Sequence, residues 1–228
     1  MRTAMILAAG RGERMRPLTD TTPKPLLQVR GKALIDYHLE KLANANIERV
    51  VINHAWLGEQ IVDHVRCGEF AGLDIVFSAE SPVLETAGGI VKALPALTKD
   101  NAREFIVVNG DVFSDVDFTQ LPDSLGEDLA HLVMVDNPEQ HPRGDFYYAQ
   151  GRLNTDGHTR LTYSGIGVYH VAMFSHLHPV RAPLAPLLID AIEQRRVSAQ
   201  HHQGEWNDVG TPDRLAALNQ GGANAGLG

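Results

Sequence analysis

The chain has 228 residues, 43% hydrophobic and 21% charged, with a single cysteine, Cys67, and a formal net charge of −8 at pH 7. This length suits one α/β domain, this composition excludes a disordered or fibrous chain, and one cysteine excludes an internal disulfide. The acidic net charge argues against a nucleic-acid partner. The apolar runs are far shorter than the roughly 20 residues of a membrane span, and the sequence has no signal-peptide pattern. We therefore predict a cytoplasmic protein without a membrane partner.

The first half of the chain alternates predicted strands with predicted helices. A short apolar run ending in Gly10 predicts a buried strand at 3–9, and a loop rich in Gly, Pro, Thr and Arg follows at 10–25. The apolar spacing then predicts, in order, a helix at 33–45, a strand at 49–53, a helix at 58–65, a strand at 73–78, a helix at 86–94, and strands at 105–109 and 132–136. Such alternation favours right-handed βαβ units and a mostly parallel sheet with helices on both faces.

The pattern changes after Asp136, where aromatic and β-branched residues occur without a long helix between them. We expect antiparallel strands at 145–153 and 161–170, a helix at 183–196, and a last strand and turn at 206–210. Thr211 and Pro212 are residue types of a helix cap and of a first helical position. With no repeat or linker in the sequence, we expect one domain at 1–220 and a disordered tail at 221–228.

The loop after the first predicted strand combines glycines with cations. Gly10 and Gly12 let backbone N–H groups approach an anion closely, and the cations Arg11, Arg14 and Lys24 can neutralise phosphate oxygens. Residues 1–32 hold seven Lys and Arg against two acids, whereas the rest of the chain is acidic. A structural turn explains two glycines but not three cations, so we predict a phosphate-binding loop of neither the Walker nor the dinucleotide type.

Asp111 and Asp208 are the candidate metal ligands. Asp111 follows the apolar strand at 105–109, at the end of a strand where ligands bind in open α/β sheets, and Asp208 lies at another strand-to-helix junction. Two such carboxylates can converge on Mg²⁺, which takes carboxylate oxygens together with phosphates and waters. A lone Asp in a turn is more often a cap or a turn residue, and we rank the metal role ahead of that alternative for both aspartates.

The chain resembles sugar-1-phosphate nucleotidyltransferases over nearly its whole length. Five segments occur in that family's order: 7–16, Thr-Pro-Lys-Pro-Leu at 22–26, Glu-Thr-Ala-Gly-Gly at 85–89, Asn-Gly-Asp-Val at 109–112 and Trp-Asn-Asp-Val-Gly-Thr-Pro at 206–212. Segments 53–57, 84–86 and 143–146 are most similar to N-acetylmuramate 1-phosphate uridylyltransferases, with mannose-1-phosphate guanylyltransferases or another member of the family as the alternative. A catalytically silent nucleotide-binding relative would have lost an aspartate or Lys24, and all are present.

The resemblance implies a fold, a reaction and partners. The fold would be a single Rossmann-like α/β domain with a mostly parallel mixed sheet flanked by helices, the nucleotide-diphospho-sugar transferase or GT-A-like fold, with 1–220 as the catalytic domain. The reaction would be the Mg²⁺-dependent joining of UTP and N-acetylmuramate 1-phosphate to give UDP-N-acetylmuramate and pyrophosphate, in peptidoglycan recycling. The enzyme would be a monomer or a small homo-oligomer.

The resemblance also implies roles for individual residues. The catalytic residues would be Arg14, Lys24 and Asp111, and the metal ligands Asp111 and Asp208. The nucleotide would be bound by Ala8, Gly10, Gly12, Glu13, Arg14, Lys24, Gly88 and Asn109, and the sugar by Glu85, Asn109 and Asp145. The alternative role for Glu85 is a cap of the helix that follows it. The chain departs from many hexose-1-phosphate enzymes because it lacks a Glu-Lys-Pro element whose lysine meets the sugar phosphate. Arg143, Arg152, Arg160 or the metal would then carry that phosphate.

Overall fold

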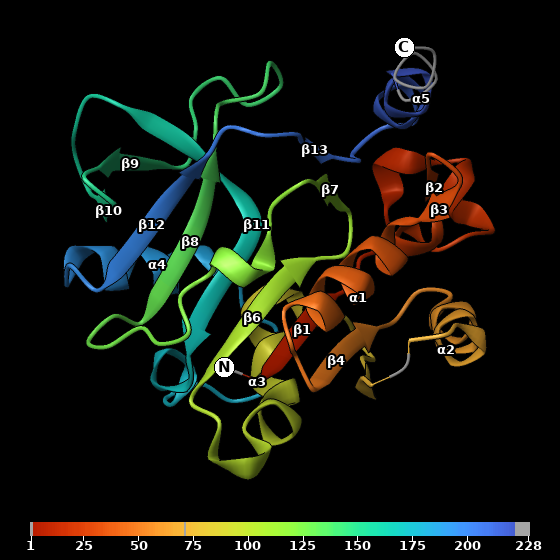
Figure 1. Ribbon diagram of the computed structural model, residues 1–228, viewed down its shortest axis with the longest axis horizontal. Helices are drawn as coiled ribbons and strands as arrows, with labels where there is room; N and C mark the ends of the chain where they lie inside the picture. Colours follow the sequence, from red (N-terminus) through yellow and green to blue (C-terminus); the bar gives the residue numbers. More distant parts are fainter. Residues whose placement is uncertain (1, 71, 222–228) are drawn as a thin grey trace.

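The computed structural model describes residues 2–70 and 72–221 (Figure 1). Within these residues one nine-stranded sheet contains β1 (Thr3–Leu7), β4 (Arg49–His54), β5 (Asp74–Ala79), β6 (Glu104–Asn109), β8 (Ala130–Val135), β9 (Phe146–Ala149), β10 (Arg152–Asn154), β11 (Arg160–His170) and β12 (Val197–His202). The strand order is β5-β4-β1-β6-β11-β8-β12-β10-β9. β10 and β11 run opposite to the others because each pairs antiparallel with its neighbours. The predicted α/β fold with a mostly parallel mixed sheet is confirmed.

Helices cover both faces of this sheet (Figure 1). They are α1 (Leu34–Asn44), α2 (Gly58–Cys67), α3 (Glu85–Leu97) and α4 (Ala185–Glu193). A fifth helix, α5 (Pro212–Gly221), lies away from this sheet, where Leu215 and Leu218 pack in a separate cluster with Leu27 and Val29 (Figure 1). Apolar residues of α1 and α2 share one buried cluster, which we call the α1/α2 core, and those of α3 and α4 share another, the α3/α4 core. No helix in the described part of the chain combines the length and apolarity that a membrane crossing requires.

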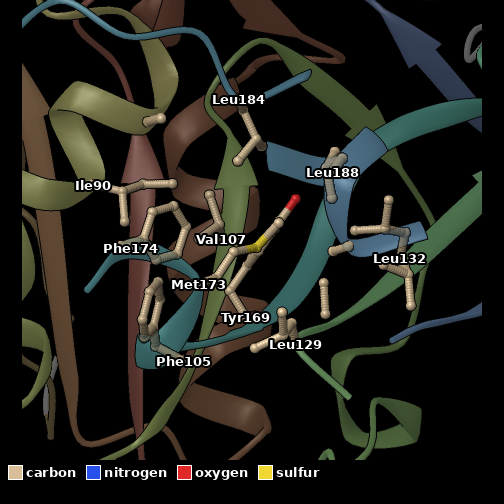
Figure 2. Packing of buried hydrophobic residues seen from close by; sticks show 14 of the residues in the cluster. Ile90, Phe105, Val107, Leu129, Leu132, Tyr169, Met173, Phe174, Leu184 and Leu188 are labelled. Atoms are coloured by element: carbon tan, nitrogen blue, oxygen red, sulfur yellow. The ribbon is translucent and has the colours of Figure 1, made fainter. Parts of the chain in front are cut away.

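Side chains along the central strands point alternately into the two cores. In β6, Phe105 and Val107 point into the α3/α4 core, whereas Ile106 and Val108 point into the α1/α2 core. Figure 2 shows Phe105 beside Tyr169 and Phe174, with ring centroids 6.1 to 6.5 Å apart. A strand that is buried on both faces has a continuous apolar run in its sequence. Such runs made β1 and β6 predictable from the sequence.

Four features of the fold differ from the sequence prediction or extend it. The predicted strand at 145–153 is two antiparallel strands, β9 and β10, joined by a turn at Gln150 and Gly151. Helix α4 is shorter than the predicted 183–196, and β12 follows it directly, where no strand was predicted. Two short pairs join the main sheet: β2 (Gln28–Val29) with β3 (Lys32–Ala33), and β7 (Val112–Ser114) with β13 (Trp206–Asp208). The predicted tail at 221–228 begins inside α5, because Gly221 is helical, and its remainder lies outside the described residues.

His38 is a buried histidine on α1. It is 3% exposed, and its Nε2 has no hydrogen-bond partner among the described residues. Burial lowers the pKa of this imidazole from 6.5 to about 4, because a charged ring would lose its hydration. His38 is therefore neutral in the folded protein at neutral and mildly acidic pH.

We expect the folded state to lose stability as the pH falls from about 6.5 to about 4 because of His38. In this window the unfolded chain binds a proton that the folded imidazole does not, so the free energy of unfolding decreases by up to about 1.4 kcal/mol per pH unit. Urea unfolding at pH 7.5 and pH 4.5 measures the loss, which should be smaller in His38→Asn than in the wild type. The exposed His176 offers a matched control, His176→Asn. Equal losses in wild type and His38→Asn would assign the effect to other groups.

Candidate active site

A cavity of about 490 Å³ opens where β1, β4 and β6 end. The three strands end together because Leu7 of β1 lies opposite both Asn53 of β4 and Asn109 of β6. Most of the predicted site residues line this cavity, namely Ala8, Gly10, Gly12, Glu13, Arg14, Lys24, Glu85, Asn109 and Asp111. Three others, Gly88, Asp145 and Asp208, are not among its lining residues.

The predicted phosphate loop is a rigid turn. Gly12 has a φ of +66°, in the left-handed region that favours glycine, and begins the short 3₁₀ turn η1 (Glu13–Met15). Its carbonyl oxygen accepts hydrogen bonds from the Met15 N–H, at 2.9 Å, and from the Thr19 hydroxyl, at 2.8 Å. Met15 occupies the position of the third glycine of a dinucleotide loop and is fully buried. The loop is therefore shaped before any ligand arrives.

The two arginines of this loop have different environments. Arg14 lines the cavity and makes no hydrogen bond or ion pair with another described residue. The guanidinium of Arg11 instead lies over the Trp56 ring, 4.7 Å from its centroid, and the Trp56 indole donates to the Thr19 carbonyl. Arg14 is therefore the cation of this pair that is free to meet an anion in the cavity.

Lys24 and Asp111 form an ion pair inside the cavity. Lys24 begins the turn η3 (Lys24–Leu26), where Pro23 and Pro25 restrict the backbone, and its side chain is only 10% exposed. Its Nζ lies 2.5 Å from Oδ2 of Asp111, which follows β6. A nearly buried ammonium requires such a partner, because an unpaired charge would lose its hydration without compensation. The pair places one positive and one negative charge at fixed positions on the cavity wall.

Asp208 lies beside Asp111 although 97 residues separate them in the sequence. In the β7–β13 pair Asp208 is opposite Val112, and the Val209 N–H donates to the Asp111 carbonyl at 3.0 Å. Its Oδ1 accepts hydrogen bonds from Arg214 and from Gln140, the latter at 2.9 Å. The topology therefore brings together the two aspartates that the sequence predicted as metal ligands.

The donor set fits a hard divalent cation. Oδ1 of Asp111 and Oδ2 of Asp208 make no hydrogen bond to another described residue, which leaves one carboxylate oxygen on each for a metal. The described residues contain no cluster of three or more His, Cys, Asp and Glu side chains arranged for a metal. Mg²⁺ commonly takes one or two carboxylates and completes its octahedron with phosphates and waters, so two aspartates suffice.

Asn53 and Glu80 form a buried polar network that the sequence did not reveal. The Asn53 side chain accepts from the Ala8 N–H at 2.7 Å and donates to Oε1 of Glu80 at 2.8 Å, while Oε2 of Glu80 accepts from the Leu84 N–H at 2.8 Å. Both side chains line the cavity. Glu80 can stay buried because donors satisfy both oxygens. The sequence signal that could have revealed these two residues is a single polar residue near the end of an apolar strand, as for Asn53, or just after it, as for Glu80.

Gly88 and Asp145 lie outside the cavity. Gly88 is buried in α3, where a Cβ would collide with the carbonyl oxygen of Val180, so this glycine allows two chain segments to approach. Asp145 accepts a hydrogen bond from the Tyr163 N–H at 2.8 Å and lies 3.0 Å from Nε2 of His141. Their ligand-binding roles stay predictions, and the structure gives each of them a local structural contact.

The alternative cations for the sugar phosphate also differ. Arg152 makes a bidentate pair with Asp128 at 2.8 and 2.9 Å, and is thereby occupied. Arg160 donates to the Asp145 carbonyl and lies over the Tyr147 ring. Arg143 makes no hydrogen bond or ion pair with another described residue. None of the three lines the cavity.

Known proteins resemble the chain throughout its length. A family model described as nucleotidyl transferase matches residues 3–150. The N-acetylmuramate alpha-1-phosphate uridylyltransferase of Neisseria meningitidis serogroup B is 52% identical over 93% of this chain and 94% of its own length. The mannose-1-phosphate guanyltransferase of Yarrowia lipolytica is 30% identical over 91% of this chain and 60% of its own length.

A solved structure supports the fold independently. The structure described as a putative glucose-1-phosphate thymidylyltransferase from Bacillus anthracis superimposes with a TM-score of 0.85, covering 100% of this chain and 98% of its own, at 17% identity. At that identity the likeness shows the fold alone. The family match and the identity to the Neisseria protein show more: the chain belongs to the nucleotidyl transferase family.

Proposed function

We propose that the protein is a Mg²⁺-dependent uridylyltransferase that joins UTP and N-acetylmuramate 1-phosphate to give UDP-N-acetylmuramate and pyrophosphate, in peptidoglycan recycling. The observation that carries this proposal is the 52% identity to a uridylyltransferase of that name over nearly the full length of both chains. The alternative, a mannose-1-phosphate guanyltransferase, has weaker support. The Yarrowia lipolytica enzyme of that name is only 30% identical, and this chain spans only 60% of its length.

The proposed reaction is an in-line displacement at phosphorus. An oxygen of the sugar phosphate attacks the α-phosphorus of UTP, a new P–O bond forms, and the bond to the β-phosphate oxygen breaks to release pyrophosphate. Such a reaction needs positioning and charge neutralisation rather than covalent help from the protein. The preformed turn at Gly12 and the unpaired guanidinium of Arg14 would hold the triphosphate. Lys24 would oppose the negative charge that increases on the α-phosphate and the leaving group.

Asp111 and Asp208 would hold the metal. When bound there, Mg²⁺ would supply positive charge between the nucleotide and sugar phosphates. The side chains around the two aspartates support this role, because Lys24 holds Asp111 through Oδ2 while Arg214 and Gln140 hold Asp208 through Oδ1, so the other oxygen of each carboxylate stays available for a metal. Both carboxylates are partly exposed, at 35% and 29%, and Asp111 lines the cavity.

Residues 1–220 would act as one catalytic domain, because the cavity is lined by segments from Leu7 to Gly210. The protein would act in the cytoplasm, where its proposed cosubstrate UTP is present. The partners would be the nucleoside triphosphate and the sugar 1-phosphate, with the protein a monomer or a small homo-oligomer.

A substrate panel tests the proposal. Pyrophosphate release is measured with UTP, GTP, CTP and dTTP, each combined with N-acetylmuramate, N-acetylglucosamine and mannose 1-phosphates and with phosphocholine. We expect the highest kcat/KM for UTP with N-acetylmuramate 1-phosphate, and no turnover when a chelator removes the metal. A preference for GTP with mannose 1-phosphate would favour the alternative, and one for CTP with phosphocholine a different relative. Nucleotide binding without any turnover would indicate a catalytically silent protein.

A further inference from the structure

The proposed sugar substrate differs from its nearest analogue by one anionic group. N-acetylmuramate carries a lactyl ether, with one carboxylate and one methyl group, where N-acetylglucosamine has a hydroxyl. A site that selects the lactyl group needs a cation with free hydrogen-bond donors and an apolar surface beside it. Arg14 and Lys24, the cations that line the cavity, are assigned to the phosphates in the proposed function. A cation for the lactyl group would therefore be a third one, beside the cavity but outside the loop that carries these two.

Arg181 is not itself among the lining residues of the cavity, but it is paired with one of them. Its Nε donates to Oε1 of Glu85 at 2.7 Å, and Glu85 lines the cavity together with Thr86. The two Nη groups of Arg181 have no hydrogen-bond partner among the described residues. A guanidinium held at Nε by a carboxylate presents both Nη groups as a planar fork, the geometry that binds a second carboxylate bidentately.

Backbone hydrogen bonds fix the position of Arg181. The neighbouring Ala182 N–H donates to the Leu84 carbonyl at 3.0 Å, and the Ala182 carbonyl accepts from the N–H groups of Ala87 and Gly88 at 3.0 and 3.2 Å. Gly88 lets this segment lie against the start of α3, because any Cβ there would collide with the Val180 carbonyl. The segment that carries Arg181 is thus attached to the cavity wall.

The partner of Arg181 has an uncommon backbone conformation. Glu85 has a φ of +60°, in the left-handed region, which costs a residue with a Cβ about 1 kcal/mol or more. It also begins α3, so the strain falls on the first residue of the helix. Such strain persists where the surrounding structure fixes it, and it is concentrated at ligand-binding sites. The ion pair with Arg181 holds the Glu85 side chain in this position.

Two exposed apolar residues are close in sequence to the pair. Val83 lines the cavity and is 41% exposed, and Val180, the residue before Arg181, is 60% exposed. Large exposed apolar side chains beside a cationic fork match a ligand group that carries both a methyl and a carboxylate. The two valines and the fork together therefore match the chemistry of a lactyl ether.

We propose that Arg181, oriented by Glu85, binds the lactyl carboxylate of the sugar substrate and thereby selects N-acetylmuramate 1-phosphate over N-acetylglucosamine 1-phosphate. This inference rests on the proposed function. Arg181 is a specificity-determining residue, because it contacts a part of the substrate distant from the reacting phosphorus. The charge-assisted pair forms in the ground state as well as in the transition state, so its loss raises KM more than it lowers kcat.

The test measures kcat/KM for both sugar phosphates with UTP in the wild type, Arg181→Ala and Arg181→Lys. We expect Arg181→Ala to lower kcat/KM for N-acetylmuramate 1-phosphate about 10- to 100-fold, mainly through KM, and to change N-acetylglucosamine 1-phosphate less than about twofold. Arg181→Lys, which keeps the charge without the fork, should lie between. If N-acetylglucosamine 1-phosphate is not turned over, its inhibition constant against the muramate substrate replaces kcat/KM.

The matched control is Arg2→Ala. Arg2 is as exposed as Arg181, at 75%, and also pairs with one glutamate, Glu48, but at the opposite end of the strands. Exposed pairs contribute little to stability, so both variants should unfold near the wild-type urea midpoint. If Arg181→Ala lowered kcat/KM equally for both sugar phosphates, the inference would be overturned and Arg181 would be assigned to the sugar phosphate. A variant with unchanged kcat/KM for both would also overturn it. A wild type that turns over other sugar phosphates but not the muramate would instead refute the proposed function.

Discussion

Asp111→Asn is expected to lower turnover by at least about 100-fold at saturating Mg²⁺ while the protein stays folded. Asn removes one negative charge and one metal-binding oxygen, but its carbonyl still accepts the hydrogen bond from Lys24. The change is therefore confined to the charge that a metal and the substrate phosphates would meet. Pyrophosphate release measures the activity, and urea unfolding measures the stability.

Asp128→Asn is the matched control for this substitution. Asp128 is also a carboxylate paired with a cation, Arg152, but it precedes β8, at the end of the sheet opposite the cavity. Its substitution should leave kcat/KM within about twofold of the wild type, since no atom near the substrate changes. If Asp111→Asn kept substantial Mg²⁺-dependent turnover, Asp111 would not be a metal ligand.

Local signals explain which parts of the fold could be predicted. Apolar runs buried on both faces, such as β1 and β6, and the apolar stripe of α1 have periods that are visible in the sequence. Strand β12 was missed because its outward residues, Ser198 and Gln200, are polar and its first residue directly follows a helical segment. The predicted helix therefore continued to 196, where the chain in fact turns back into the sheet.

Local signals also explain which residues of the candidate site could be predicted from the sequence. The loop that lines the cavity could be predicted as part of a site because Gly12, Arg14 and Lys24 lie within one short segment of the sequence. Glu80 and Arg181 are single polar residues whose significance depends on partners that the topology supplies. No spacing rule links Arg181 to Glu85, because their contact spans 96 residues.

Gly88 shows how much a glycine leaves open. Its predicted approach to the ligand stays a prediction, and the structure shows a close approach to the Val180 carbonyl. Glycine indicates that something must come near the backbone, but the sequence does not tell whether it is a ligand or another part of the chain.

Lys24→Met is expected to change turnover and metal affinity in opposite directions. Nζ of Lys24 lies 2.5 Å from the carboxylate that a metal would use, so the ammonium and the cation compete for Asp111. Removing the ammonium should strengthen Mn²⁺ binding in the absence of nucleotide by at least about tenfold, or about 1.4 kcal/mol, because two cations that share one carboxylate repel each other. The same substitution should lower turnover by at least about 100-fold, since the positive charge near the α-phosphate is lost.

Titration of Mn²⁺ by electron paramagnetic resonance measures the metal affinity, and pyrophosphate release measures turnover. Lys24→Arg keeps the charge and should leave Mn²⁺ affinity near that of the wild type, although a planar fork does not reproduce the ammonium position. Unchanged Mn²⁺ affinity in Lys24→Met would mean that the lysine and the metal do not share Asp111. In the double variant Lys24→Met/Asp111→Asn, the gain in affinity should disappear, because the carboxylate that the lysine masks is no longer there. Turnover of the double variant should be only slightly lower than that of the less active single variant, because residues that act as one unit have non-additive effects on turnover.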